Sequence, residues 1–211
     1  MNLKGLTINF LGDSITEGVG VAEPKNIYHQ IIKEKCGLEF AYNYGVSGTR
    51  IARQIVPTKE STKYDLTFEL RSDVMNPNAD VVVVFGGTND FGHGDAPFGT
   101  LEDNDVYTFC GAVNSLINKL QKDFSNSKIV FLTPLHRTGE DIPSAPDSKT
   151  LEDYVNAIRE ICAKHAVSVI DLFGINPLDP SDADVVPDGL HPNDKGHHIM
   201  AKVIGEGLVA L

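Results

Sequence analysis

The sequence predicts an α/β fold built on a parallel β-sheet. Segments with strand composition and segments with helical periodicity alternate five times along the 211 residues. The strand-like segments are short and almost entirely apolar, which is typical of strands that are buried on both faces. We therefore expect right-handed crossovers that place helices on both faces of the sheet. The length favours a single domain over residues 1–211.

The first half of the chain accounts for three strands and two helices. The expected strands are residues 7–11, 38–44 and 81–85. Pro24 suits the first turn of a helix, and this helix should end near Gly37, because glycine is common directly after a helix. A second helix has to stop before Pro77, since the residue before a proline disfavours the helical conformation. Its apolar face would carry Leu66, Leu70 and Val74.

The second half continues the alternation. A long amphipathic repeat over residues 104–124 predicts a helix, and a fourth strand over residues 129–132 is closed by Pro134. Another helix and a fifth strand, residues 167–172, come next, and a last helix begins after Pro192. The inward residues expected on these two helices are Leu151, Val155, Ile158 and Cys162, and then Ile199, Val203, Ile204 and Leu208.

The charge balance argues against two classes of partner. There are 18 Lys and Arg residues against 29 Asp and Glu residues, which gives a formal net charge of −11. Such a chain has little affinity for the phosphates of a nucleic acid or for an anionic membrane surface. No signal-peptide segment precedes the first strand, and the longest purely apolar run, residues 81–85, is too short to cross a bilayer. We therefore expect a cytoplasmic location.

No pattern indicates a metal or an organic cofactor. Cys36, Cys110 and Cys162 are far apart and form no C-x-x-C pair. They are expected as small apolar residues in helices rather than as a disulfide framework or a zinc site. The acidic residues that precede Asp188 fit no EF-hand spacing, so a solvated loop is the better interpretation.

Polar residues follow the strands at the point where each strand ends. Asp13 and Ser14 come directly after the first strand, and Gly48 follows the second. Asn89 follows the third strand, and the loop after the fifth leads to residues 188–191. The carboxyl ends of parallel strands meet at one edge of an open sheet, where ligands bind. Acyl transfer needs a nucleophile, a base, an acid that orients the base, and donors for an oxyanion at such a place.

These residues fit the roles that acyl transfer requires. Ser14 is the candidate nucleophile and His191 the candidate base. Asp188 lies three residues before His191, close enough for one turn to bring its carboxylate to the imidazole. Asn89 offers a side-chain amide, and Gly48 offers a backbone N–H that can be approached closely. Taken singly, several of them have an ordinary explanation as a helix cap or a turn residue. Together, at one edge of the sheet, they favour an active site.

Four motifs carry a resemblance to a known family. They are Gly12-Asp13-Ser14, Gly48 within GVSGTR, Gly87-Thr88-Asn89-Asp90 and Asp188-Gly189-Leu190-His191. In this order and spacing they resemble the motifs of the SGNH hydrolases, also called the GDSL esterases and lipases, and they frame the whole chain. The leucine that usually follows the serine is replaced by Ile15, which is a conservative change.

The resemblance implies a three-layer α/β/α sandwich of flavodoxin-like type with a five-stranded parallel sheet. It also implies that Ser14 attacks an ester carbonyl while His191 acts as general base and then as general acid. Asp188 would orient His191. The backbone N–H groups of Ser14 and Gly48, together with the amide of Asn89, would form the oxyanion hole.

Other residues near these motifs have weaker roles. Ser47 is a poor rival for the nucleophile, because Thr49 stands where the G-x-S-x-G elbow of the α/β-hydrolases has its last glycine. Asp13, His93 and His136 follow strands at the same edge and are candidate substrate-binding residues, although ordinary loop and cap roles are open to them as well.

The predicted activity is that of a serine esterase on small acyl or acetyl esters, with an acetylated carbohydrate as a suitable substrate and no cofactor. Residues 91–105 and 135–149, which would form the pocket walls, are poor in large aliphatic residues, and this disfavours a long acyl chain. Residues elsewhere, such as Ile51 or Val186, could still close an apolar pocket.

Three alternatives remain at this point. The first is a lysophospholipase or thioesterase that acts on longer acyl chains. The second is a non-catalytic binding module, because a fold alone does not secure a function. A phosphate-binding loop at residues 12–20 is disfavoured, because the Gly-x-x-x-x-Gly-Lys motif of a P-loop is missing there. The sequence makes no prediction of the oligomeric state.

Overall fold

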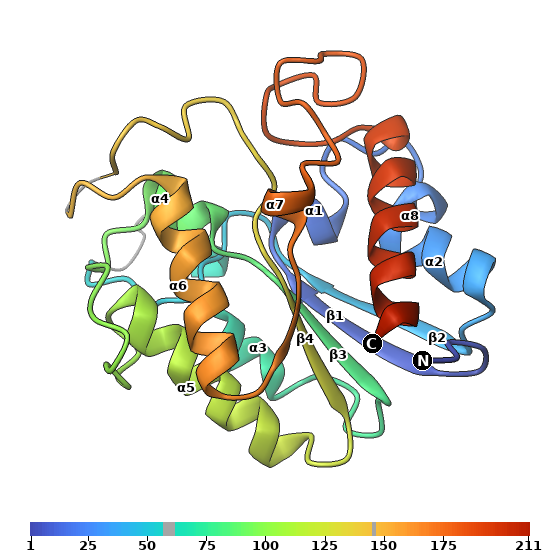
Figure 1. Cartoon of the computed structure of the whole chain (residues 1–211), viewed down its shortest axis with the longest axis horizontal. Coiled ribbons are helices and arrows are strands. Elements are labelled where there is room, and N and C mark those ends of the chain that lie inside the picture. The colour runs from blue at the N-terminus through green and yellow to red at the C-terminus, as the bar shows by residue number, and fades with distance from the viewer. Residues whose placement is uncertain (57–61, 145–146) are drawn as a thin grey trace.

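The computed structural model of the chain describes residues 1–56, 62–144 and 147–211. Within these residues, five strands form one parallel sheet in the order β2-β1-β3-β4-β5 (Figure 1). The strands are β1 (Thr7–Gly12), β2 (Phe40–Gly45), β3 (Val81–Phe85), β4 (Lys128–Leu132) and β5 (Ser168–Ile170). The α/β fold and the parallel sheet that the sequence predicts are thereby confirmed, and the strand order is that of flavodoxin-like folds.

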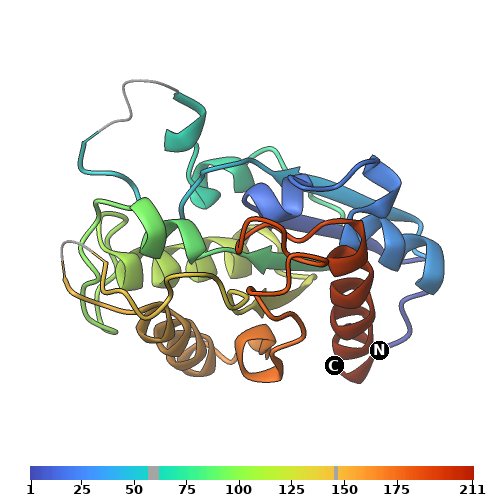
Figure 2. The ribbon, with the colours of Figure 1, turned by 90° about the horizontal axis from the view of Figure 1, so that it is seen from above.

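Helices cover both faces of the sheet (Figures 1 and 2). On one face lie α2 (Tyr28–Cys36) and α8 (Asp194–Ala210), and on the other lie α3 (Phe68–Ser72), α5 (Phe109–Asp123) and α6 (Leu151–Lys164). Three short helices come directly after strands: α1 (Ser14–Glu17), α4 (Thr88–His93) and α7 (Leu172–Ile175). The two termini lie side by side, and the Met1 ammonium donates to the carbonyl of Val209.

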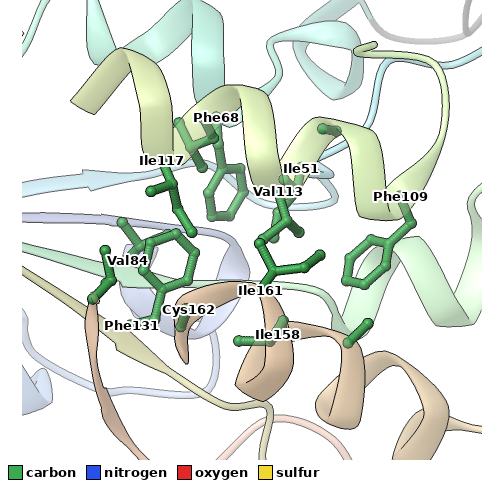
Figure 3. Close-up of a cluster of buried hydrophobic side chains, with 14 of the residues drawn as sticks. Ile51, Phe68, Val84, Phe109, Val113, Ile117, Phe131, Ile158, Ile161 and Cys162 are labelled. Carbon is green, nitrogen blue, oxygen red and sulfur yellow. The ribbon is translucent and has the colours of Figure 1, made fainter. Parts of the chain in front are cut away.

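Strand β3 joins the two hydrophobic cores that the layers enclose. Val82 and Val84 belong to the core under α3, α5 and α6, whereas Val83 and Phe85 belong to the core under α2 and α8. All residues of β3 are buried, as expected for a central strand of a parallel sheet. The labelled side chains of the first core in Figure 3 are Ile51, Phe68, Val84, Phe109, Val113, Ile117, Phe131, Ile158, Ile161 and Cys162.

Two helices begin later than the sequence predicts. The helix expected from residue 104 begins at Phe109, because Asp105 accepts the backbone N–H groups of residues 107 and 108 and Thr108 caps the helix. Pro24 opens a short 3₁₀ helix, Pro24–Asn26, and α2 begins only at Tyr28. At the start of α5, polar side chains that bind nearby backbone N–H groups compete with helix formation, and an apolar periodicity does not show this competition.

The apolar face predicted for the helix before Pro77, which is α3 in the structure, is wrong. Leu66, Leu70 and Val74 are 44%, 42% and 74% exposed. Helix α3 spans only five residues and buries Phe68 and Arg71 instead. The Arg71 guanidinium takes the inward position because it finds hydrogen-bond acceptors there, which are described below.

The face predicted for the last helix is correct only in part. Ile204 and Leu208 of α8 are buried and Val203 packs partly against the core, but Ile199 lies at the surface. The helix is rotated so that His197 faces inward, where its Nδ1 accepts the backbone N–H of Tyr28 at 3.1 Å. This bond between α8 and α2 favours the observed rotation over the one that the apolar pattern suggests.

The cysteines occupy helical positions, as expected. Cys110 and Cys162 are buried in α5 and α6, and Cys36 is partly buried at the end of α2. In the part of the chain that the structure describes, no helix has the length and apolar character needed to cross a membrane. Over the same residues, no three His, Cys, Asp or Glu side chains gather where they could hold a metal ion.

Replacing His29 with glutamine should make the folded state less sensitive to acid. The buried ring donates from Nε2 to the carbonyl of Thr16 and accepts from Gln30 at Nδ1, and burial lowers its pKa to about 4. The unfolded chain, with an ordinary histidine pKa, therefore takes up the proton first, and stability is lost as the pH falls from about 6.5 towards 4. Between pH 7 and pH 4 the wild type should lose roughly 3 kcal/mol more than the variant.

Urea unfolding at the two pH values measures this difference in the free energy of unfolding. The other titrating groups are the same in both proteins, so their effects cancel in the comparison. Equal losses of stability in the wild type and in His29→Gln would contradict the prediction.

Candidate active site

The order of the strands reverses at β1. The chain passes from β1 to β2 on one side and then returns to β3 on the other side. In open α/β sheets, such a switch point leaves a crevice outside the carboxyl ends of the strands, where ligands bind. Ser14 follows the end of β1, and Asn89 follows the end of β3, the neighbouring strand. Two of the candidate residues thus stand at the switch point.

Ser14, His191 and Asp188 form a continuous series of hydrogen bonds. His191 Nε2 lies 3.0 Å from Ser14 Oγ, and His191 Nδ1 lies 2.7 Å from Asp188 Oδ2. Ser14 is buried, whereas the Asp188 side chain is 55% exposed. The structure therefore brings together three residues that are up to 177 positions apart in the sequence.

Asp188 fixes both the ring and the turn that carries it. Its Oδ1 accepts the backbone N–H groups of Leu190 and His191 at 2.9 Å and 2.6 Å. Partial burial tends to raise the pKa of this carboxyl, but the N–H groups that His191 and Leu190 donate outweigh burial and lower the pKa to about 2. Asp188 thus stays ionised, and His191 Nδ1 carries the ring proton. Nε2 is left with its lone pair towards the Ser14 hydroxyl.

The turn after β1 explains why glycine and aspartate precede Ser14. A Cβ on residue 12 would lie 2.0 Å from Thr16 Oγ1, so only glycine lets α1 begin so close to the strand. Asp13 caps α1, because its carboxylate accepts the backbone N–H of Ile15 at 3.0 Å. Burial raises the Asp13 pKa to about 6. The Gly-Asp pair thus places Ser14 in the first turn of a buried helix.

Two candidate oxyanion donors, Asn89 and Gly48, lie in α4 and in the loop after β2. Asn89 is buried in α4, where its Nδ2 donates to the carbonyl of Thr49 at 3.0 Å and its Oδ1 faces His93 Nε2 at 3.0 Å. Gly48 lies in the loop after β2 with φ +74°, and a Cβ there would come within 2.5 Å of the Tyr64 ring. The left-handed backbone and the covering ring both require glycine at this position.

Arg71 holds this corner of the sheet together, and sequence reasoning missed it. Its guanidinium donates to the carbonyls of Gly12 and Tyr44, at the ends of β1 and β2, and to Thr49 Oγ1 at 2.8 Å. Its Nε donates to the carbonyl of Leu66 at 2.9 Å. A planar group with five donors suits such a cluster of acceptors. Nothing in the sequence signals this role, because three of the four acceptors are backbone carbonyls.

A family model described as the GDSL-like lipase/acylhydrolase family matches residues 10–199. The chain belongs to this family. The protein is therefore a hydrolase that acts on ester bonds, which confirms the resemblance drawn from the four motifs.

Solved structures resemble this chain over nearly its whole length. One is 34% identical, covers 100% of this chain and 99% of its own, and has a TM-score of 0.84. A protein from Lactobacillus plantarum is 29% identical, with 98% of each chain covered and a TM-score of 0.82. An acetyl xylan esterase is 25% identical over 96% of this chain and 100% of its own, with a TM-score of 0.67. A search of curated proteins found no match.

The three candidate substrate-binding residues of this GDSL-family hydrolase each contact protein groups. Asp13 caps α1, as described above, and His93 contacts Asn89. His136 stacks on Phe173, with Nδ1 2.7 Å from a Glu140 carboxylate oxygen and Nε2 3.1 Å from the Phe173 carbonyl. Their contact with a substrate stays a prediction from the sequence.

Ser47 lies in a different environment from Ser14. Its hydroxyl and its backbone N–H both donate to the carboxylate of Glu17, the N–H at 2.7 Å. The contact holds the start of the Gly48 loop against α1. Its hydroxyl thus faces a carboxylate, whereas the Ser14 hydroxyl faces His191.

Proposed function

We propose that this GDSL-family hydrolase is a serine esterase that removes small acyl groups, acetyl above all, from polar alcohols. The hydrogen-bonded series from Ser14 Oγ through the His191 ring to Asp188 Oδ2 carries the proposal. It contains the three parts that an activated serine needs, namely a nucleophile, a base at hydrogen-bond distance and a carboxylate that orients the base.

In this reaction Ser14 Oγ attacks the ester carbonyl while its proton passes to His191 Nε2. The charge that develops on the carbonyl oxygen is met by the N–H groups of Ser14 and Gly48 and by the Asn89 amide. The bond to the alcohol then breaks, and His191 returns the proton to the leaving oxygen. Water attacks the acyl-serine ester with His191 again as base, which releases the carboxylic acid and restores Ser14.

The packing of the surrounding side chains supports a small acyl group. Phe91 is buried, and Phe98 packs against the core under α5 and α6. Ile51 and Val186, which could have closed an apolar pocket, are buried in the two cores. These apolar side chains are thus committed to the fold. A long acyl chain gains about 0.8 kcal/mol for each buried CH₂ and would find few of them as partners.

The nature of the alcohol is supported by one solved structure. The acetyl xylan esterase reported above is 25% identical to this chain over almost its whole length. An acetylated carbohydrate also agrees with the polar composition of residues 91–105 and 135–149, of which residues 145 and 146 lie outside the described part of the chain.

The test is kcat/KM along a series of p-nitrophenyl esters: acetate, butyrate, octanoate and palmitate. We expect the maximum at acetate or butyrate, with Ser14→Ala as the blank for each ester. Release of acetate from an acetylated xylooligosaccharide, measured in parallel, tests the alcohol. A maximum at octanoate or beyond would refute the small acyl group and favour a lysophospholipase or thioesterase.

A further inference from the structure

The Asn89 amide has to be held in one of two orientations. A carboxamide can turn by 180° about its last bond, and the turn exchanges Nδ2 for Oδ1. Only Nδ2 can donate to an oxyanion, and Oδ1 in its place would repel the charge. An oxyanion hole that uses Asn89 therefore needs neighbours that distinguish the two ends of the amide.

Two neighbours make this distinction. The Thr49 carbonyl accepts from Nδ2 at 3.0 Å, and the His93 ring nitrogen Nε2 lies 3.0 Å from Oδ1. His93 is four residues after Asn89 in α4, and this spacing places the two side chains on one face of the helix. If the amide were turned, Oδ1 would face a carbonyl oxygen and Nδ2 would face the ring, which is costly in a buried position.

The ring can make this distinction only when its proton is on Nε2, and Arg50 selects that tautomer. Arg50 Nη1 lies 3.1 Å from His93 Nδ1 and donates to the His93 carbonyl at 3.0 Å. A guanidinium has only donors, so Nδ1 must accept and the proton of the neutral ring must be on Nε2. His93 is exposed at one side, and the partial loss of solvent around its ring lowers its pKa. The positive charges of Arg50 and Arg137 lower it further.

We propose that His93 is a positioning residue that holds Asn89 with its Nδ2 available to the oxyanion. The inference rests on the proposed function, because it assigns His93 a role in that oxyanion hole, and it requires no contact between His93 and the substrate. This role is separate from holding residues 51 and 52 against α4. Asp90 ties residues 51 and 52 to α4, since its carboxylate accepts both of their N–H groups, at 3.0 Å and 2.9 Å.

His93→Leu should lower kcat for p-nitrophenyl acetate by roughly 10–10²-fold and leave KM within about threefold, because the amide then keeps only the Thr49 carbonyl as a guide and spends more of its time turned. His93→Gln should recover most of the kcat, since glutamine offers an N–H to Asn89 and a carbonyl to Arg50. Asn89→Ala by itself should lower kcat by roughly 10²–10³-fold. In that background His93→Leu should cause no further loss, because no amide is left to orient.

A matched control lies outside the site. His165 Nε2 is 2.8 Å from Asn114 Oδ1, so this histidine makes the same kind of contact with an asparagine elsewhere in the fold. His165→Leu should keep the kcat of the wild type. A loss of kcat in His165→Leu equal to that in His93→Leu would show a general effect on stability and would overturn the inference.

The possible results distinguish the role of His93 from the proposed function. An inactive Ser14→Ala together with a wild-type kcat in His93→Leu would overturn the role of His93 and leave the proposed function standing. The same follows if His93→Leu lowers kcat equally with and without Asn89. Turnover that survives in Ser14→Ala would overturn the proposed function and, with it, the role of His93.

Discussion

Replacing Ser14 with alanine should lower kcat for p-nitrophenyl acetate by roughly 10⁴–10⁶-fold. The Ser14 hydroxyl lies 3.0 Å from His191 Nε2 and is the nucleophile of the proposed reaction. An alanine there would leave only the oxyanion donors and substrate binding. Steady-state kinetics measure the loss. Mass spectrometry after treatment with a fluorophosphonate should find one label on the wild type, at Ser14, and none on the variant.

Ser127→Ala is a matched control for this experiment. Ser127 lies just before β4, at the opposite edge of the sheet from Ser14. In the wild type its hydroxyl donates to the carbonyl of Ala79. This variant should keep both the activity and the label. A label that persists in Ser14→Ala, or that is found on Ser47, would contradict the assignment of the nucleophile.

Replacing His191 with alanine should lower kcat by a similar roughly 10⁴–10⁶-fold, because the Ser14 hydroxyl then has no base. Labelling by the fluorophosphonate should become slower for the same reason. The double variant Ser14→Ala, His191→Ala should be no less active than either single variant, since the two residues act in one step.

His198→Ala is the control here, because His198 is exposed on α8, where its Nδ1 lies 3.0 Å from the carbonyl of Asp194. It should leave kcat unchanged. If the double variant lost kcat by the product of the two single losses, Ser14 and His191 would not act in the same step. A wild-type kcat in His191→Ala would show that His191 is not the base.

The centre of the sheet could be predicted because β1, β3 and β4 are almost entirely buried. Residues 81–85 are a continuous apolar run for this reason, and the crossover helices α5 and α6 are long enough to show a repeat. The helices α1, α4 and α7 contain four, six and four residues, which is too short for a periodic pattern. The start of α5 also depends on the caps at residues 105 and 108 rather than on apolar spacing.

The candidate site could be predicted from the positions of residues at strand ends. Ser14 and Asn89 follow parallel neighbours, so any parallel arrangement of these strands brings them to one edge. Arg71 could not be predicted, because its partners are mostly carbonyls that only the folded chain brings together. The spacing of Asn89 and His93 is present in the sequence, but nothing there shows that Arg50 reaches the far side of the ring.

The bonds of Arg71 also bear on the order in which the chain folds. Its acceptors at Gly12 and Tyr44 are 59 and 27 residues away along the chain. Such bonds form only after the intervening loops have closed. Loop closure costs chain entropy, and the contacts that offset this cost form only afterwards. We therefore expect the turn at Ser14 and the loop at Gly48 to reach their final places when α3 docks. During refolding, esterase activity should return with this long-range assembly and not with the local structure around the serine.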